Sequence, residues 1–204
     1  MVMLERLIEQ GVVKGFFEFN ELGKLDKSCC LKSELEVIDF DKTKETIVSL
    51  NKSLQQPKST DALKIIPKLN RLDFIELKGF KIFIQRDKTK NFQKKIEDFD
   101  LEGKIIDSLF ILDCIVKDNS IQFNKEETKE YRHTEKYYFI VVDIELSKDP
   151  IQDRLINLIF LSLRSSLKCI KKSSLHNLNK PKLLSCNQID SYYQGLLSKD
   201  SETI

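Results

Sequence analysis

Several features that would define a class of protein are scarce in this sequence. There are only six glycines, and none forms a glycine-rich phosphate loop, which argues against nucleotide-binding folds that depend on close approach of the backbone. No apolar run is long enough for a membrane span, and Met1–Gln10 is typical of a short amphipathic helix rather than a secretory leader. We therefore expect a protein with no membrane segment that resides in the cytoplasm.

The cysteines also define little. They number five, which is odd, and they show no C-x-x-C spacing. This pattern argues against a disulfide framework and against a zinc site, and it indicates a reducing compartment. The neighbours Cys29 and Cys30 could oxidise, although buried cysteines act more often as small apolar side chains. The two histidines, His133 and His176, have no partner at metal-ligand spacing.

The composition that is present favours one folded domain over residues 1–204. Hydrophobic residues make up 41% and charged residues 32% of the chain, which is close to a globular average. The formal net charge is only +2, because 34 basic residues face 32 acidic ones. A polyanionic partner would therefore have to bind a local basic patch rather than the whole surface.

The pattern of apolar residues predicts an α/β or α+β fold with a mixed central sheet flanked by helices. Asp61–Ile66 and Arg71–Gln85 are separated by a turn at P-K-L-N and predict a β-hairpin. Further strands are expected at Gly15–Asn20, Ser33–Asp41, Ser120–Asn124 and Tyr137–Leu146. Helices are expected at Lys42–Asn51 with Asp41 as cap, at Glu97–Lys117 and at Ile151–Ile170, with a helical, basic C-terminal extension over about 147–204.

Two charged residues interrupt the apolar second strand of this hairpin. Residues two apart on a strand share a face, so Glu76 and Lys78 project together, whereas Asp73 lies on the other face. If the preceding strand pairs beside them, Asp61 brings a second carboxylate to the same edge. Two carboxylates suit a hard divalent cation such as Mg²⁺, and the lysine could orient water or offset negative charge.

Asp61, followed after residues 62–75 by Glu76-Leu77-Lys78, resembles the active-site signature of the PD-(D/E)xK, or restriction-endonuclease-like, nuclease superfamily. The resemblance covers about Asp41–Leu146, within a nuclease-like core of about residues 30–146, and Thr60 stands where the signature has proline. It implies hydrolysis of nucleic acid, DNA rather than RNA, with Mg²⁺ or Mn²⁺ as cofactor. In that comparison Asp61 and Glu76 are the metal ligands and Lys78 the catalytic lysine.

The superfamily often has a further acidic residue on its first core helix. By resemblance the candidate is Glu45, or Glu34 or Glu36 if the helix lies elsewhere. The E-x-K pattern also occurs at Glu102-Gly103-Lys104 and Glu127-Thr128-Lys129, where we expect ordinary solvated charges. The same interpretation, a solvated strand face, is the alternative for Glu76 and Lys78.

Basic residues cluster in two places. Between Asp153 and Asp190 the chain carries no acidic residue, and a second cluster follows the E-x-K strand directly. Such patches suit phosphate contacts, although a solvated helix face is the alternative. The nucleic-acid-binding candidates are Arg86, Lys88, Lys90, Arg164, Lys168, Lys171 and Lys172.

The sequence leaves two classes of function open. One is a metal-dependent nuclease or nuclease subunit. The other is a non-catalytic interaction or accessory subunit on a related fold, in which the strand charges meet a protein partner or a second copy of the chain. Fold analogy alone does not separate them. Carboxylates of Asp61 and Glu76 that converge beside Lys78 would favour the enzyme, whereas an Asp61 that points into solvent away from Glu76 would exclude it.

Overall fold

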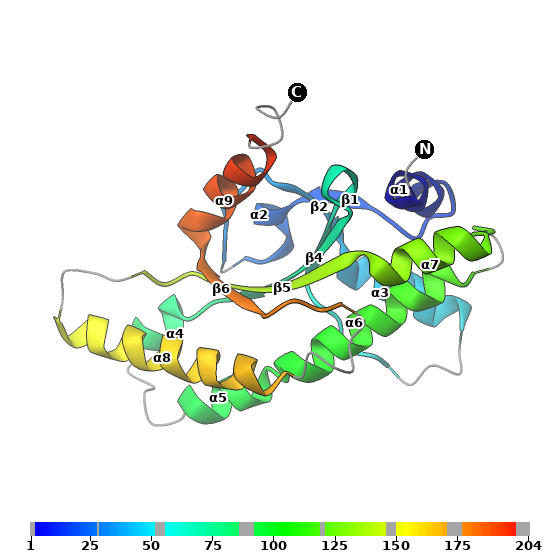
Figure 1. Cartoon of the computed structure of the whole chain (residues 1–204). Helices are drawn as coiled ribbons and strands as arrows, with labels where there is room; N and C mark the ends of the chain where they lie inside the picture. The colour runs from blue at the N-terminus through cyan, green and yellow to red at the C-terminus, as the bar shows by residue number, and fades with distance from the viewer. Residues whose placement is uncertain are drawn as a thin grey trace.

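The structure is a computed structural model, and it describes residues 3–27, 29–51, 56–85, 92–118, 121–145, 150–170 and 177–198. Within these residues, six strands form one sheet with helices on both faces (Figure 1). The predicted mixed sheet flanked by helices is thereby confirmed. No helix in the described part of the chain combines the length and the apolar character needed to cross a bilayer.

The strands lie in the sheet in the same order as in the chain. The first four pair antiparallel, and β4–β5 and β5–β6 pair parallel. Parallel neighbours need a crossover, which α4 to α7 supply between β4 and β5 and α8 supplies between β5 and β6. The strands are β1 (Phe19–Glu21), β2 (Glu36–Asp39), β3 (Ala62–Ile66), β4 (Arg71–Lys78), β5 (Glu135–Val142) and β6 (Lys182–Ser185).

The helices divide between the two faces of the sheet. α2 and α9 pack against one face, where Val37, Ile75 and Ile189 belong to the same apolar cluster. The larger cluster lies on the other face beneath α1, α3, α6, α7 and α8. The helices are α1 (Met3–Val13), α2 (Leu22–Leu25), α3 (Phe40–Leu50), α4 (Lys81–Gln85), α5 (Phe92–Asp98), α6 (Leu101–Val116), α7 (Lys125–His133), α8 (Pro150–Cys169) and α9 (Cys186–Ser198), with a 3-10 turn η1 (Pro67–Leu69).

The predicted hairpin is confirmed as β3 and β4, joined through η1 and Asn70, whose φ is 45°. β4 ends at Lys78, so the prediction that it reaches Gln85 is wrong. The backbone nitrogens of Phe80 and Lys81 donate to the Asp143 carboxylate, which satisfies donors at the start of α4. A distant aspartate thus ends the strand.

Helix starts differ from the predicted ones for local reasons. Asp39 rather than Asp41 caps α3, because its carboxylate accepts from the backbone nitrogen of Lys42 at 3.2 Å. The helix predicted from Glu97 begins only at Leu101. Asp100, at a φ of 46°, separates it from α5 and caps it by accepting from the backbone nitrogen of Gly103.

Three further predictions differ from the structure. The strand expected at Ser120–Asn124 is absent over the described residues 121–124, and α7 follows it. Its start has a reciprocal capping box between Asn124 and Glu127, a signal that was present in the sequence. The C-terminal extension is also not only helical, because β6 adds a strand parallel to β5. At the N-terminus, β1 begins at Phe19, later than the strand expected from Gly15.

Candidate active site

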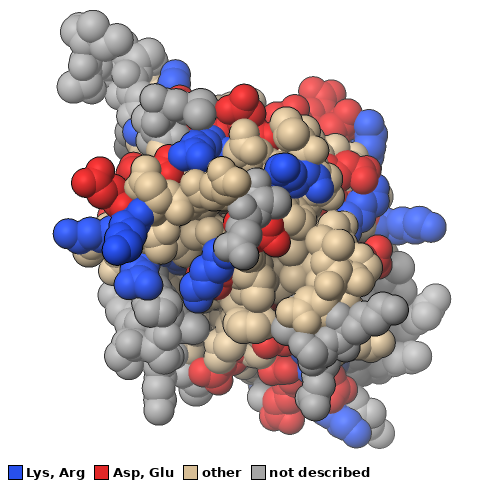
Figure 2. Space-filling model, turned by 90° about the vertical axis from the view of Figure 1, so that its right-hand side faces the viewer, with Lys and Arg blue, Asp and Glu red and all other residues tan. Residues whose placement is uncertain are grey.

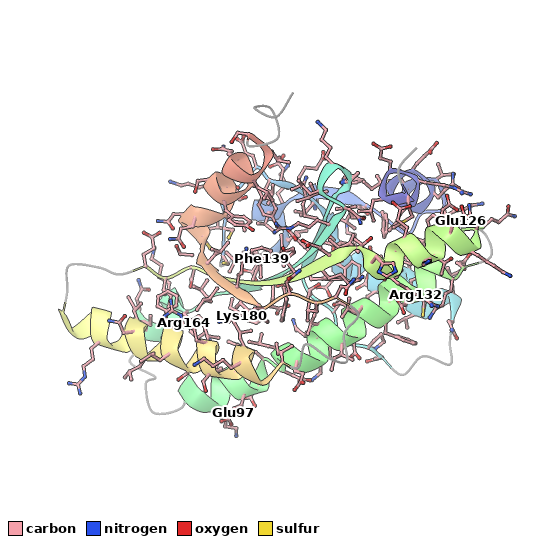
Figure 3. The ribbon with its side chains drawn as sticks, in the orientation of Figure 1. Glu97, Glu126, Arg132, Phe139, Arg164 and Lys180 are labelled. Carbon is pink, nitrogen blue, oxygen red and sulfur yellow. The ribbon has the colours of Figure 1, made fainter. Side chains whose placement is uncertain are left out.

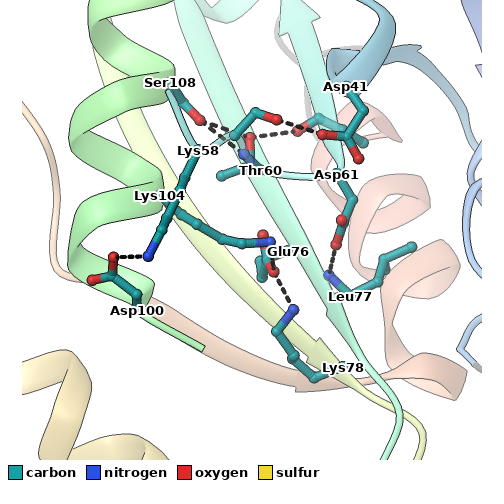
Figure 4. Close-up of polar contacts among 12 residues, drawn as sticks. Asp41, Lys58, Thr60, Asp61, Glu76, Leu77, Lys78, Asp100, Lys104 and Ser108 are labelled. Atoms are coloured by element: carbon teal, nitrogen blue, oxygen red, sulfur yellow. Dashed lines mark hydrogen bonds and ion pairs between the residues drawn. The ribbon is translucent and has the colours of Figure 1, made fainter. Parts of the chain in front are cut away.

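The hairpin register places Asp61 beside Glu76. Ala62 pairs with Ile75, so Asp61, one residue earlier, lies opposite Glu76, one residue later. Side chains directly opposite on antiparallel strands have Cβ atoms about 5 Å apart. The Asp61 carboxylate also accepts a hydrogen bond from the backbone nitrogen of Leu77 at 2.6 Å (Figure 4). The structure therefore brings the two predicted metal ligands together.

Glu76 is fully buried, and two lysines share one of its oxygens. Its Oε1 accepts from Lys78 of the same strand and from Lys104 of α6, the latter at 2.6 Å (Figure 4). The side chain of Lys78 is 14% exposed and that of Lys104 is 21% exposed, against 0% for Glu76. The two ammonium groups therefore connect a buried carboxylate to the surface.

The other oxygen of Glu76 has no partner. Among the described residues, Glu76 Oε2 and the Tyr138 hydroxyl are the buried side-chain polar atoms without a hydrogen bond. Tyr138 lies on β5, and its side chain belongs to the apolar cluster on the α6 face. A buried acceptor without a donor costs roughly 1–3 kcal/mol, so an unpaired carboxylate oxygen calls for an explanation.

The electrostatics link the two carboxylates. Burial, together with the nearby charge of Glu76, raises the pKa of Asp61 to about 7, although Lys78 and the backbone N–H of Leu77 act in the opposite direction. Burial by itself lowers the pKa of Lys104, but Glu76 and Asp61 raise it above its ordinary value. Asp61, Glu76, Lys78 and Lys104 thus form one interacting group, which we call the carboxylate–lysine cluster.

Lys104 corrects one of the sequence predictions. The Glu102-Gly103-Lys104 copy of E-x-K was expected to be solvated, and Glu102 is indeed exposed. Lys104 instead points from α6 to Glu76, because it follows Leu101 and precedes Ser108 on the buried side of the helix. The helical spacing of Lys104 from these buried positions was the signal that could have identified it.

A surface cavity of about 570 Å³ opens beside Lys104. Glu45 of α3 lines it, together with Asp41, whose Oδ1 pairs with Lys44 and accepts from Ser59. The other two candidate acids, Glu34 and Glu36, line a separate depression near β1. Of the three acidic residues considered from the sequence, Glu45 is the one on the side of the cluster.

The predicted nucleic-acid contacts are only partly described. Arg164 and Lys168 are exposed on α8 and line a cavity of about 360 Å³ with Lys180 and Lys182. Figure 3 labels Arg164 on α8 and Lys180 just before β6. On the face seen in Figure 2, by contrast, basic and acidic side chains are interspersed. Arg86, Lys88, Lys90, Lys171 and Lys172 lie outside the described residues.

Comparisons with known proteins add no relative. No family model matches the chain, and neither the curated proteins nor the solved structures give a match. The class of the protein is therefore stated from its own geometry. It is a helix-flanked mixed sheet with a carboxylate–lysine cluster where the antiparallel hairpin meets α6.

Proposed function

We propose that the protein is a metal-dependent nuclease that hydrolyses phosphodiester bonds of nucleic acid, DNA rather than RNA. Asp61 and Glu76 would be its metal ligands and Lys78 its catalytic lysine. The order β2, β3, β4, α6, β5 agrees with the core that the PD-(D/E)xK resemblance implies. The observation that carries the proposal is the unpaired Oε2 of Glu76, opposite Asp61.

These residues suit Mg²⁺ or Mn²⁺. Such ions take oxygen ligands, often only one or two carboxylates, and retain several waters. Glu76 offers a buried oxygen that no donor in the described chain satisfies, and Asp61 is fixed beside it by the backbone of Leu77. A bound Mg²⁺ would polarise a phosphoryl oxygen and lower the pKa of a coordinated water.

The two lysines have separate tasks in this proposal. Lys104 holds Glu76 Oε1 from α6, which fixes the carboxylate and directs Oε2 away from that ion pair. Lys78 lies on the same strand as Glu76, its side chain is partly exposed, and its ammonium could orient the attacking water or offset charge on the phosphate. In this proposal Lys104 would be a positioning residue, and Lys78 would contact the substrate.

Basic residues of α8 and the β6 edge would supply phosphate contacts. Arg164, Lys168, Lys180 and Lys182 line one cavity, which concentrates positive charge in a molecule of nearly balanced charge. Contacts of this type are sequence-independent and weaken as salt rises. They would hold the nucleic acid, whereas the carboxylate–lysine cluster would cut it.

One observation favours the alternative function, a non-catalytic interaction or accessory subunit. The two carboxylates of the cluster are matched by two ammonium groups, and Glu76 is fully buried. A cluster balanced in this way can be purely structural. In that case the surface of the protein would bind a partner chain or a second copy without any metal.

Nuclease assays with matched variants separate the two functions. Purified protein is incubated with single- and double-stranded DNA and RNA in Mg²⁺ or Mn²⁺, beside Glu76→Ala, Lys78→Ala and a Lys64→Ala control. Lys64 lies on β3, and its ammonium donates to the Glu36 carbonyl, away from the cluster. We expect the first two variants to lose at least about 100-fold in cleavage rate, as when a group that stabilises a transition state is removed.

The same assays can overturn the proposal. Equal cleavage by all four proteins would assign the activity to a contaminant. If the folded wild-type protein cuts none of the substrates with either metal, the nuclease proposal fails and the interaction function takes its place. Cleavage that continues in excess EDTA would exclude the metal-dependent form of the proposal.

A further inference from the structure

Three cysteines from distant parts of the chain meet on the face opposite the carboxylate–lysine cluster. Cys29 and Cys30 lie in the loop between α2 and β2, and Cys186 is the first residue of α9. Cys186 Sγ lies 2.7 Å from Cys29 Sγ and 2.8 Å from Cys30 Sγ, and the latter two atoms are 3.6 Å apart. Sequence spacing gave no sign of this cluster, because one ligand is remote from the other two.

The backbone explains how two adjacent cysteines can point to one place. Neighbouring side chains on an extended chain diverge, but Cys30 has a φ of 56° in the left-handed region. Its backbone nitrogen also donates to Cys186 Sγ at 2.9 Å. The loop is therefore built around Cys186.

The charges around the three sulfurs are negative. Asp26 accepts from the backbone nitrogen of Cys29 at 3.0 Å. Asp190 lies one turn after Cys186 on α9 and accepts from the Ser33 hydroxyl, three residues after Cys30, at 2.5 Å. Acidic surroundings oppose a free thiolate, whereas a cation bound by the sulfurs would be stabilised there.

We propose that Cys29, Cys30 and Cys186 bind a zinc ion through three thiolates. Zinc takes cysteine sulfur readily, and three protein ligands leave the fourth tetrahedral position to a water molecule. Thiols that are protonated release their protons to solvent on binding. The site is distinct from the proposed Mg²⁺ site, because thiolates select a soft metal and carboxylates a hard one.

The geometry needs one adjustment. Zinc–sulfur bonds of about 2.3 Å separate tetrahedral sulfurs by about 3.8 Å. Cys29 Sγ and Cys30 Sγ are already 3.6 Å apart, so mainly Cys186 Sγ has to move outward, by about 1 Å. Cys186 is only partly buried, which leaves room for that movement and for the water ligand.

A metal at this position would join two parts of the fold. It would connect the loop before β2, near one edge of the sheet, to the junction of β6 and α9 at the other. Binding energy at a site that exists only in the folded chain is folding energy. We therefore expect zinc to raise the melting temperature of the whole protein.

The test uses the full-length, reduced, metal-free protein. Zinc is titrated in competition with a chromophoric chelator, and cadmium serves as a second probe because cadmium–thiolate bonds absorb in the ultraviolet. The expected result is one ion per chain, with binding weakened about tenfold or more in Cys186→Ser and in Cys30→Ser. Cys114→Ser, on α6 and outside the cluster, is the matched control and should bind normally.

Control measurements separate a loss of zinc binding from a loss of folding. Circular dichroism shows whether each variant is folded, and wild-type cadmium absorbance reports thiolate ligation without any variant. Glu76→Ala should bind zinc normally, so failure of the nuclease proposal leaves this one intact. Absence of tight zinc binding by the reduced protein would overturn it. A second result would also overturn it. In that result, mass spectrometry shows a disulfide from Cys186 to Cys29 or Cys30 in the isolated protein, and neither the oxidised nor the reduced protein binds zinc.

Discussion

Strand β4 carries two fully buried carboxylates, one on each face, and they differ in how many of their oxygens accept hydrogen bonds. Asp73 faces α9, and both of its oxygens are used: Arg71 donates to Oδ1 at 2.6 Å and to Oδ2 at 2.8 Å, and the Tyr193 hydroxyl donates to Oδ2 at 2.9 Å. Glu76 faces α6, and both of its lysines bind one oxygen. Three residues apart, the same strand has a closed site and an open one.

The comparison shows what distinguishes a structural ion pair from a candidate functional site. Burial and opposite charge are common to both. The difference lies in how many acceptor positions remain, because a bidentate arginine fills a carboxylate and two lysine ammoniums on one oxygen do not. The cluster around Asp73 holds α9 to the sheet, whereas the one around Glu76 retains capacity for a ligand.

The largest difference in stability is expected between variants that lack the Asp73 carboxylate and variants that lack the Glu76 carboxylate. Asp73→Ala leaves Arg71 buried without its partner and should lower the free energy of unfolding by about 3–5 kcal/mol. Glu76→Gln should cost less than about 2 kcal/mol, since Lys78 and Lys104 both reach solvent. Urea denaturation measures both values. Equal losses would mean that the two sites are equally structural.

The second largest effect is the pH dependence of stability that Asp61 causes. Its folded pKa of about 7 lies above the ordinary value of 3.8, so the folded protein retains a proton that the unfolded chain releases between these two values. Stability of the metal-free protein should therefore fall as pH rises from about 4 to 7, by about 2 kcal/mol after allowing for partial solvent access.

Asp61→Asn should remove this part of the pH dependence, because the amide oxygen can still accept from the Leu77 nitrogen but cannot ionise. Denaturation of both proteins in EDTA at about pH 5 and about pH 8 makes the measurement. Identical pH profiles would show that Asp61 is solvated rather than held beside Glu76.

Mg²⁺ should stabilise the folded protein by binding at Glu76, the open site, and not at Asp73, the closed one. At ten times its dissociation constant, a ligand that binds only the folded state contributes about 1.4 kcal/mol. We expect Mg²⁺ to raise the melting temperature of the wild-type protein and of Tyr193→Phe, and to have no such effect on Glu76→Gln. A shift that persists in Glu76→Gln would place the ion elsewhere.

The smallest effects come from two buried tyrosines and should differ in sign. Tyr193→Phe removes a hydrogen bond to Asp73 and should cost about 1 kcal/mol. Tyr138→Phe removes a hydroxyl without a partner and should stabilise the metal-free protein by up to about 1 kcal/mol. Thermal denaturation of both variants in EDTA tests this prediction. A clear loss of stability in Tyr138→Phe would contradict the unpaired state of the Tyr138 hydroxyl.

Local patterns predicted the part of the site that lies on the hairpin. The alternation of β4 separated Asp73 from Glu76 and Lys78, and the turn at P-K-L-N aligned β3 so that Asp61 faces Glu76. A short turn and a period of two set these positions, and both can be found in the sequence. The mixed sheet followed from the order of the same elements.

What the sequence did not predict depends on contacts between distant segments. Lys104 reaches Glu76 only because α6 crosses back over the sheet, and Cys186 reaches Cys30 from a separation of 156 residues. Asp143, one residue after β5, accepts from the backbone nitrogen of Phe80 just after β4. The local pattern of apolar and polar residues does not predict such long-range contacts. The capping box of α7 is different, since Asn124 and Glu127 are only three residues apart and the pattern is local to the sequence.

The identity of strand order and chain order has a consequence for how the molecule is made. A sheet that adds each new strand to the edge left by the previous one needs no threading and can grow as the chain leaves the ribosome. Both strands of the β3–β4 hairpin precede α6 in the chain, so Asp61 and Glu76 are synthesised before Lys104. A nascent chain in which this hairpin has formed carries two adjacent carboxylates with one lysine until α6 adds the second.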